Sequence, residues 1–143
     1  MPPSSLQDAY SQTPLVLAAE GNHIQCIRYL CTLDGVNIRS QDLFHRSAIH
    51  WAAHNGNLDA VCDLFSAGAD VSATTTSGET ALHWACSSTR ISQSATRRLL
   101  LEALIARGAS TSQLNYLQQR PVDVLVDDDT DVIAFLLAAQ EQV

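Results

Sequence analysis

The sequence predicts an all-α solenoid of short helical repeats, and three observations lead to this fold class. Three similar blocks, TPLVLAAEGNH, SAIHWAAHNGN and TALHWACSSTR, begin at Thr13, Ser47 and Thr80, at spacings of 34 and 33 residues. Each is followed by an apolar stretch with helical periodicity: HIQCIRYL, LDAVCDLF or LLLEALIA. The second and third stretches then end in Gly-Ala. Because a fixed period of about 20–50 residues is typical of repeat architectures, each block is expected to begin one two-helix unit.

The ends of the expected helices carry residues that favour such ends. Ser47 and Thr80 can cap the N-terminus of the first helix of a unit, and Pro14 fits a first helical position. Gly68 and Gly108 follow a second helix and can adopt the left-handed conformation that ends many helices. Such short helices cannot bury their apolar faces alone, so neighbouring units must stack into one continuous core.

The repeated unit resembles the ankyrin repeat, with its Thr-Pro-Leu-His-x-Ala signature and Gly-Ala-Asp ending. Residues 42–74 fit this pattern almost position for position, and the resemblance covers residues 8–140. It implies an ankyrin-type solenoid with short β-hairpin-like fingers. The first repeat departs from the pattern: it lacks one residue after LAA, lacks the Gly-Ala-Asp ending and has Val16 in the histidine position. The implied divisions are a disordered tail, residues 1–7, and a domain, residues 8–143. The domain contains four repeats, at approximately 8–41, 42–74, 75–114 and 115–143, of which the last is a cap.

The fourth repeat is degenerate, as expected where the end of a stack faces water. In RPVDVLV, Pro121 is kept and Asp123 takes the histidine position, while DVIAFLLAAQ provides the second helix. The acidic run at 127–131 lacks the Gly and Glu that a calcium loop needs at its sixth and twelfth positions. These carboxylates instead precede a helix, where Asp129 or Thr130 would form the cap.

His50 and His54 lie four residues apart on an expected helix, which raises the alternative of a zinc site. Zinc needs one or two further ligands, and His45 and Cys62 do not form a recognisable ligand spacing with them. The ankyrin resemblance gives His50 and His83 a structural role, in which the side chain hydrogen-bonds the backbone and joins neighbouring repeats. A structural role is therefore preferred, and no metal or other cofactor is expected.

Trp51 and Trp84 occupy equivalent positions one period apart. A tryptophan stripe could form a ligand platform, but such residues belong to the core more often. The core interpretation is preferred for both.

The third repeat carries an insertion of seven residues within SSTRISQSAT, residues 87–96. Together with Arg97, Arg98 and Arg107 it forms an expected basic patch that faces the acidic DVLVDDDTD of the next repeat. One interpretation is mutual neutralisation of neighbouring repeats. The other is a specificity loop or a phosphorylation-controlled contact, because long loops often carry function. Neutralisation is preferred, since exposed charge pairs are common and weak.

Composition restricts the classes of partner and location. The chain has 143 residues and a net charge of −7, which disfavours nucleic acid and anionic membranes as partners. It contains neither a long apolar run nor a signal peptide, so we expect a monomer in the cytoplasm or nucleus. The four cysteines, at positions 26, 31, 62 and 86, form no C-x-x-C pair and are expected to be buried thiols in a reducing compartment.

The resemblance implies a non-catalytic protein–protein interaction module, either an adaptor or an inhibitor, that binds a protein partner through its concave surface and fingers. An alternative is an N-terminal targeting or substrate-recruiting domain of a larger enzyme. A metal- or cysteine-dependent enzyme is the third alternative, but the sequence has no G-x-S-x-G, phosphate-binding glycine loop or H-E-x-x-H motif.

The expected partner-binding residues are those at the variable positions of the family. Aromatic and arginine residues dominate interface energies, so Tyr10, Phe44, Arg46 and Tyr116 are the expected anchors. Joint replacement of Phe44 and Arg46 is expected to weaken a partner and leave the melting temperature nearly unchanged. The variable positions fall on Tyr10, Gln12, Glu20, Leu43, Phe44, Arg46, His54, Asn55, Thr76, Ser77, Glu79, Ser87, Ser88, Tyr116, Leu117 and Gln119.

Overall fold

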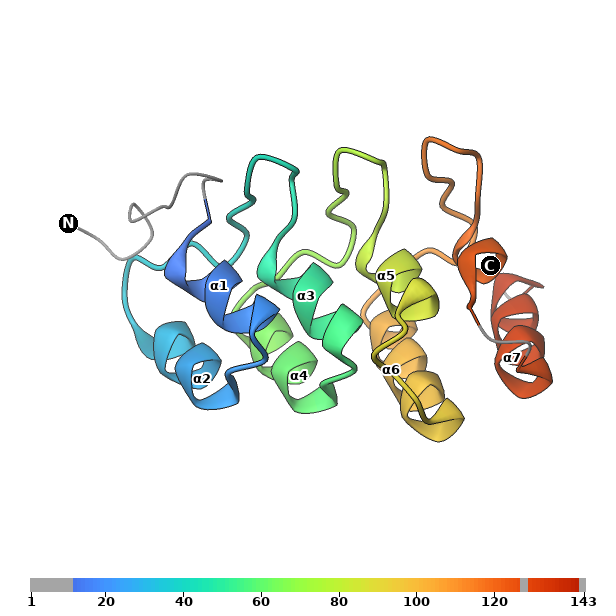
Figure 1. Ribbon diagram of the computed structural model, residues 1–143, viewed down its shortest axis with the longest axis horizontal. Helices are drawn as coiled ribbons and strands as arrows, with labels where there is room; N and C mark the ends of the chain where they lie inside the picture. Colours follow the sequence, from blue (N-terminus) through green and yellow to red (C-terminus); the bar gives the residue numbers. More distant parts are fainter. Residues whose placement is uncertain (1–11, 127–128, 142–143) are drawn as a thin grey trace.

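Pairs of short helices stack in two rows in the computed structural model, which describes residues 12–126 and 129–141 (Figure 1). The inner row contains α1, α3, α5 and the 3₁₀ turn η2, each in contact with the next, and α2, α4, α6 and α7 form the outer row in the same way. Within the described residues no strand is present, which confirms the all-α class. The expected tail at 1–7 lies outside those residues. The elements are α1 (Pro14–Glu20), α2 (Ile24–Thr32), α3 (Ala48–Asn55), α4 (Leu58–Ser66), α5 (Ala81–Ser87), α6 (Ser94–Ala106), η2 (Pro121–Val124) and α7 (Thr130–Glu141).

The helices begin where the capping residues predict. Thr80 Oγ1 accepts a hydrogen bond from the backbone N–H of His83, in the first turn of α5. Asp129 Oδ1 accepts from the N–H groups of Asp131 and Val132, so Asp129 rather than Thr130 caps α7. In the fourth repeat, Asp123 accepts from the backbone N–H of its cap residue at 2.8 Å, which is the contact that the histidines make in the preceding two repeats.

The core lies between the two rows and runs the length of the stack. The inner helices contribute fully buried alanines, whose small side chains let neighbouring helices approach closely, and the outer helices contribute leucines that fill the space between the rows. Trp51 belongs to this core, whereas Trp84 is only half-buried, so the expectation of a core residue is confirmed for Trp51 alone. Representative core residues are Leu15, Ala19, Ile27, Ile49, Ala52, Ala53, Leu64, Leu82, Ala85, Leu100, Leu104 and Leu136.

The first repeat is more regular than its sequence indicates. Asn22 has φ 58° and stands where Gly56 has φ 70°, so no residue is missing after LAA. The one-residue difference instead follows α2, and beyond it Gly35 has φ 81°, as Gly68 has 107°. The predicted gap was wrong because the glycine of the first repeat, Gly21, precedes the position equivalent to Gly56, which Asn22 occupies. Only the positive φ of an asparagine, which tolerates that conformation, shows the correct register.

The fingers are closed loops, so β-hairpins are not found in them. In each described finger the first residue donates its N–H to the carbonyl oxygen four residues later, at 2.9–3.0 Å. Its side-chain oxygen accepts from two backbone N–H groups of the same finger. The fourth residue has a positive φ, which turns the chain back. The first residues are Asp42, Thr75 and Asn115, and the fourth are His45, Gly78 and Gln118.

Candidate protein-binding surface

The finger loops 42–46, 75–79 and 115–119 project to the same side of the inner row (Figure 1). We call these loops, with the exposed side of α3 and α5, the finger face. Two of the loops carry large exposed apolar side chains: Leu43 is 58% exposed, Phe44 48%, Tyr116 73% and Leu117 79%. The loop between them is polar, with Thr76 and Ser77 exposed. Large apolar side chains exposed on one face mark an interaction surface more often than single scattered ones do.

Hydrogen bonds between neighbouring fingers fix these tips in place. The Thr76 N–H donates to the Phe44 carbonyl oxygen at 3.0 Å, and the Tyr116 N–H donates to the Ser77 carbonyl oxygen at 3.0 Å. The Tyr116 ring also lies close over Gly78, where a Cβ atom would stand 2.7 Å from Tyr116 Cδ1. The exposed side chains therefore stand on an ordered backbone, which lowers the entropic cost of binding.

Arg46 stabilises the second finger through internal contacts. Its Nε donates to Asp42 Oδ2 at 2.6 Å, and the Asp42 side chain is fully buried. The guanidinium carbon also lies 5.0 Å from the ring centroids of both Phe44 and Trp51. Removing Arg46 would leave a buried carboxylate without its cation. The expectation that Arg46 can be replaced without loss of stability therefore conflicts with this geometry.

Below the fingers, aromatic rings from α3 and α5 meet around a small hollow. Trp51 and Trp84 pack edge to face with ring centroids 5.1 Å apart, and His54 contacts Trp51 at 5.8 Å and Trp84 at 5.7 Å. Together with Glu79 and Ser87 they line a hollow of about 210 Å³. Burial, followed by the charge of Arg90, lowers the pKa of His54, so this ring is neutral at neutral pH. The sequence did not distinguish Trp84 from Trp51, because the two share one position of the repeat.

The signature histidines join neighbouring repeats, as the resemblance implies. His50 Nε2 contacts the Glu79 carbonyl oxygen at 3.1 Å, and His83 Nε2 contacts the Gln119 carbonyl oxygen at 2.9 Å. His50 Nδ1 accepts from the Ser47 N–H at 3.2 Å. Both ring nitrogens of His50 are therefore engaged, which opposes a zinc pair with His54. In the part of the chain that the structure describes, no three His, Cys, Asp or Glu side chains gather closely enough to hold a metal ion.

The insertion of the third repeat is built into the fold around a buried arginine. Arg97 is 1% exposed and donates to four backbone carbonyl oxygens, at distances between 2.6 and 3.2 Å. The expected surface patch of Arg97, Arg98 and Arg107 is therefore wrong for Arg97, because carbonyl groups of α5 and of the insertion surround it. Arg98 pairs with Glu102 of its own helix, and Arg107 lies over the Phe65 ring of α4. The four acceptors are on Ala85, Cys86, Ser88 and Ile91.

The insertion also contacts the preceding repeat beside the finger face. Ser88 Oγ donates to the His54 carbonyl oxygen at 2.5 Å, and Arg90 donates to Asn55 Oδ1 at 2.5 Å. Asn55 Nδ2 in turn donates to the Ala19 carbonyl oxygen at 2.7 Å. Arg90, which the variable positions did not include, is thus an exposed residue of the insertion that contacts the end of α3. Its place depends on a contact 35 residues away in sequence, which no local pattern reveals.

Several expected partner-binding residues are not available to a partner. Ser88 is fully buried, and Gln12 is 6% exposed and donates to Glu20 at 2.8 Å. The expectation that Gln12 and Ser88 bind a partner is therefore wrong, because both side chains form internal hydrogen bonds. Tyr10 lies outside the described residues. The remaining expected residues are exposed or half-buried: Glu20, Leu43, Phe44, Arg46, His54, Asn55, Thr76, Ser77, Glu79, Ser87, Tyr116, Leu117 and Gln119.

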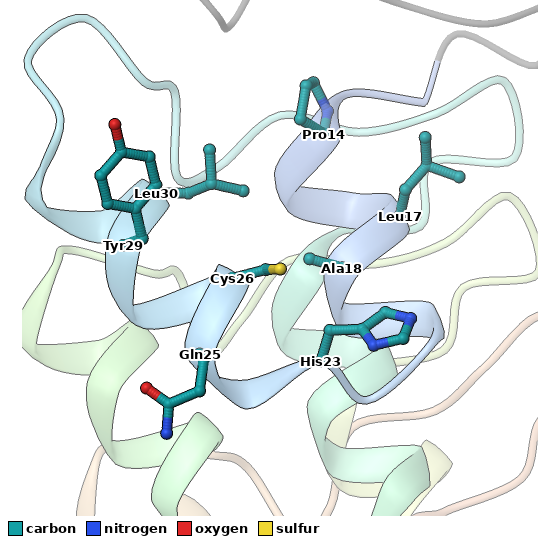
Figure 2. A pocket seen from close by; sticks show the side chains of 8 residues that line it. All are labelled: Pro14, Leu17, Ala18, His23, Gln25, Cys26, Tyr29 and Leu30. Atoms are coloured by element: carbon teal, nitrogen blue, oxygen red, sulfur yellow. The ribbon is translucent and has the colours of Figure 1, made fainter.

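A second hollow, of about 610 Å³, lies at the α1–α2 end of the stack (Figure 2). Leu17 and Tyr29 are exposed there, and Cys26 of α2 points toward Ala18 of α1. Its lining is mostly apolar, with His23 and Gln25 as polar members. Within the described residues, α1 and α2 pack against α3 and α4 on one side only, and the residues that line this hollow all belong to α1, α2 and the turn between them.

The cysteines are less buried than expected. Cys26 and Cys62 are exposed and Cys31 is intermediate, so only Cys86 is buried. The expectation was wrong for the first three, because these thiols lie on outer helices that are covered only in part, and Cys26 lines the hollow at the α1–α2 end of the stack.

A family model for ankyrin repeats (three copies) matches residues 2–75 and 49–142, which together span nearly the whole chain. The chain belongs to the ankyrin repeat family. Ankyrin repeats are generally non-catalytic modules for protein–protein interaction, which agrees with the exposed finger face. Among the described residues, none of the ankyrin helices is long and apolar enough to cross a membrane.

Proposed function

We propose that this ankyrin repeat protein is an adaptor or inhibitor that binds a protein partner through its finger face, in the cytoplasm or nucleus. The observation that carries the proposal is the pair of exposed apolar tips, Leu43–Phe44 and Tyr116–Leu117, held in place by finger-to-finger hydrogen bonds. Aromatic side chains on an ordered backbone are the usual anchors of a protein interface. The same surface would serve the alternative, in which the repeats recruit a substrate to an enzyme in a longer chain.

Affinity capture from lysate, analysed by mass spectrometry, tests the proposal. The bait is the intact chain beside the double variant Phe44→Ala, Tyr116→Ala, which leaves the Arg46–Asp42 pair intact. Tyr29→Ala is the matched control, because Tyr29 is 64% exposed but lies on α2 in the outer row. We expect the intact chain and the control to retain a partner that the double variant loses. The three proteins should have equal melting temperatures. Equal capture by all three baits would contradict a role for the finger tips.

A further inference from the structure

The second repeat contains an internal arrangement of an arginine, an indole ring and a carboxylate. The Arg46 guanidinium lies over the Trp51 ring at 5.0 Å, and its Nε donates to Asp42 at 2.6 Å. A planar guanidinium can stack on an aromatic face while it donates to a carboxylate at its edge, which an ammonium group cannot do.

The third repeat keeps the indole but has a carboxylate at the position that the arginine occupies in the second repeat. Exactly one period after these residues, Trp84 replaces Trp51, Glu79 replaces Arg46 and Thr75 replaces Asp42. Glu79 and Trp84 both line the hollow of about 210 Å³. Among the described residues, neither a cation–π contact to Trp84 nor an ion pair of Glu79 is found.

Hydrogen bonds hold the backbone of Glu79, whereas its carboxylate has no ion pair among the described residues. Its N–H donates to Thr75 Oγ1 at 3.3 Å, and its carbonyl oxygen accepts from Thr75 N–H at 2.9 Å and contacts His50 Nε2 at 3.1 Å. The finger therefore fixes the backbone of Glu79, which lines the hollow. The neutral His54 ring, which also lines the hollow, adds no positive charge that would repel a cation. The Arg90 side chain is held by its hydrogen bond to Asn55.

We propose that this hollow binds an arginine side chain of the protein partner, with the guanidinium on Trp84 and its edge toward Glu79. The inference rests on the proposed function, and it names the chemistry that the partner must present. The partner's arginine would stack on Trp84 as Arg46 stacks on Trp51, and Glu79 would supply the carboxylate that Asp42 supplies in the second repeat. The net charge of −7 favours the approach of a basic segment.

Intrinsic fluorescence provides a direct test, because the chain has two tryptophans and both line this hollow. The probe is a blocked peptide of four arginines, and its comparison is the same peptide with citrulline, the neutral isostere, at each position. We expect a saturable change in tryptophan fluorescence with the arginine peptide and none with the citrulline peptide. The same change with both peptides, or none with either, would overturn the proposal.

Two variants separate this site from general attraction between opposite charges. Glu79→Gln removes the carboxylate in the hollow, and Asp59→Asn removes an exposed carboxylate of α4 with the same change in net charge. We expect Glu79→Gln to weaken binding of the arginine peptide about fivefold and Asp59→Asn to leave its affinity nearly unchanged. Equal weakening by the two variants would show that the peptide senses only net charge, which would overturn the proposal.

The finger-tip variant distinguishes failure of this inference from failure of the proposed function. Phe44→Ala, Tyr116→Ala should lose the captured partner yet keep the fluorescence response to the arginine peptide. If the finger-tip variant loses the partner and Glu79→Gln retains it at full yield, the proposed interaction function stands and the arginine site is overturned.

Discussion

Trp51 and Trp84 stand one repeat apart and meet edge to face, with their ring centroids 5.1 Å apart. The contact joins α3 to α5, so the aromatic cluster is part of the interface between the second and third repeats as well as a wall of the hollow. Its two members differ in burial, since Trp51 is 9% exposed and Trp84 only half-buried.

Replacing Trp51 by alanine should reduce the free energy of unfolding by about 3–5 kcal/mol, the usual cost of deleting a buried aromatic side chain. Trp84→Ala should cost less, because part of that ring already faces solvent. Urea denaturation followed by circular dichroism measures both. A loss below about 1 kcal/mol for Trp51→Ala would contradict its place in the core.

Stability should fall with acid because His50 is buried as the neutral ring. Burial lowers the pKa of His50 from 6.5 to about 4. Between these two values the unfolded chain binds a proton that the folded chain does not, so stability is full above about pH 6.5 and falls as the pH drops toward 4. The loss attributable to His50 is roughly 3 kcal/mol.

Urea midpoints measured at about pH 7 and 4.5 test this coupling. Carboxylates also titrate in part of that range, so His50→Asn is the reference. The variant should be less stable at neutral pH and should lose less stability on acidification than the parent chain. A parallel decline in both proteins would exclude His50 as the source.

Arg97 should be among the most costly residues to replace, although it is charged. Arg97→Met removes the donors to the carbonyl groups of Ala85 and Ile91, at 2.6 and 2.9 Å, and leaves buried acceptors unpaired. We expect a loss of about 3 kcal/mol or more. The neighbouring Arg98→Met is the control: its exposed pair with Glu102 predicts a loss under about 1 kcal/mol. Similar losses in the two variants would refute the buried role.

The four thiols should react with a disulfide reagent in a set order. Cys26 and Cys62 are exposed and should react first. Burial raises the pKa of Cys31, which should therefore react more slowly. Burial raises the pKa of Cys86 to about 12, so this thiol should react only when the chain unfolds. Reaction of all four thiols at one rate in native buffer would contradict the burial of Cys86.

The sequence by itself determined the repeat and its local chemistry. The capping by Thr80, the positive φ at Gly68 and Gly108 and the inter-repeat role of His50 and His83 all agree with prediction. The caps and the glycines depend on residues within one turn of each other and recur with the repeat, whereas the role of His50 and His83, whose acceptors lie 29 and 36 residues away, came from the family resemblance. Periodicity and local hydrogen bonding can therefore be predicted from a single sequence.

Only the tertiary structure decided which polar residues face a partner and which hold the fold together. Arg97 looked like part of a surface patch, Ser88 like a contact residue and Arg46 like a replaceable anchor, yet each is fixed by internal contacts. Their acceptors include carbonyl groups of a neighbouring repeat or of an insertion that no other repeat shares. Burial of a polar side chain depends on where such groups converge in space, and that convergence has no periodic signal in the sequence.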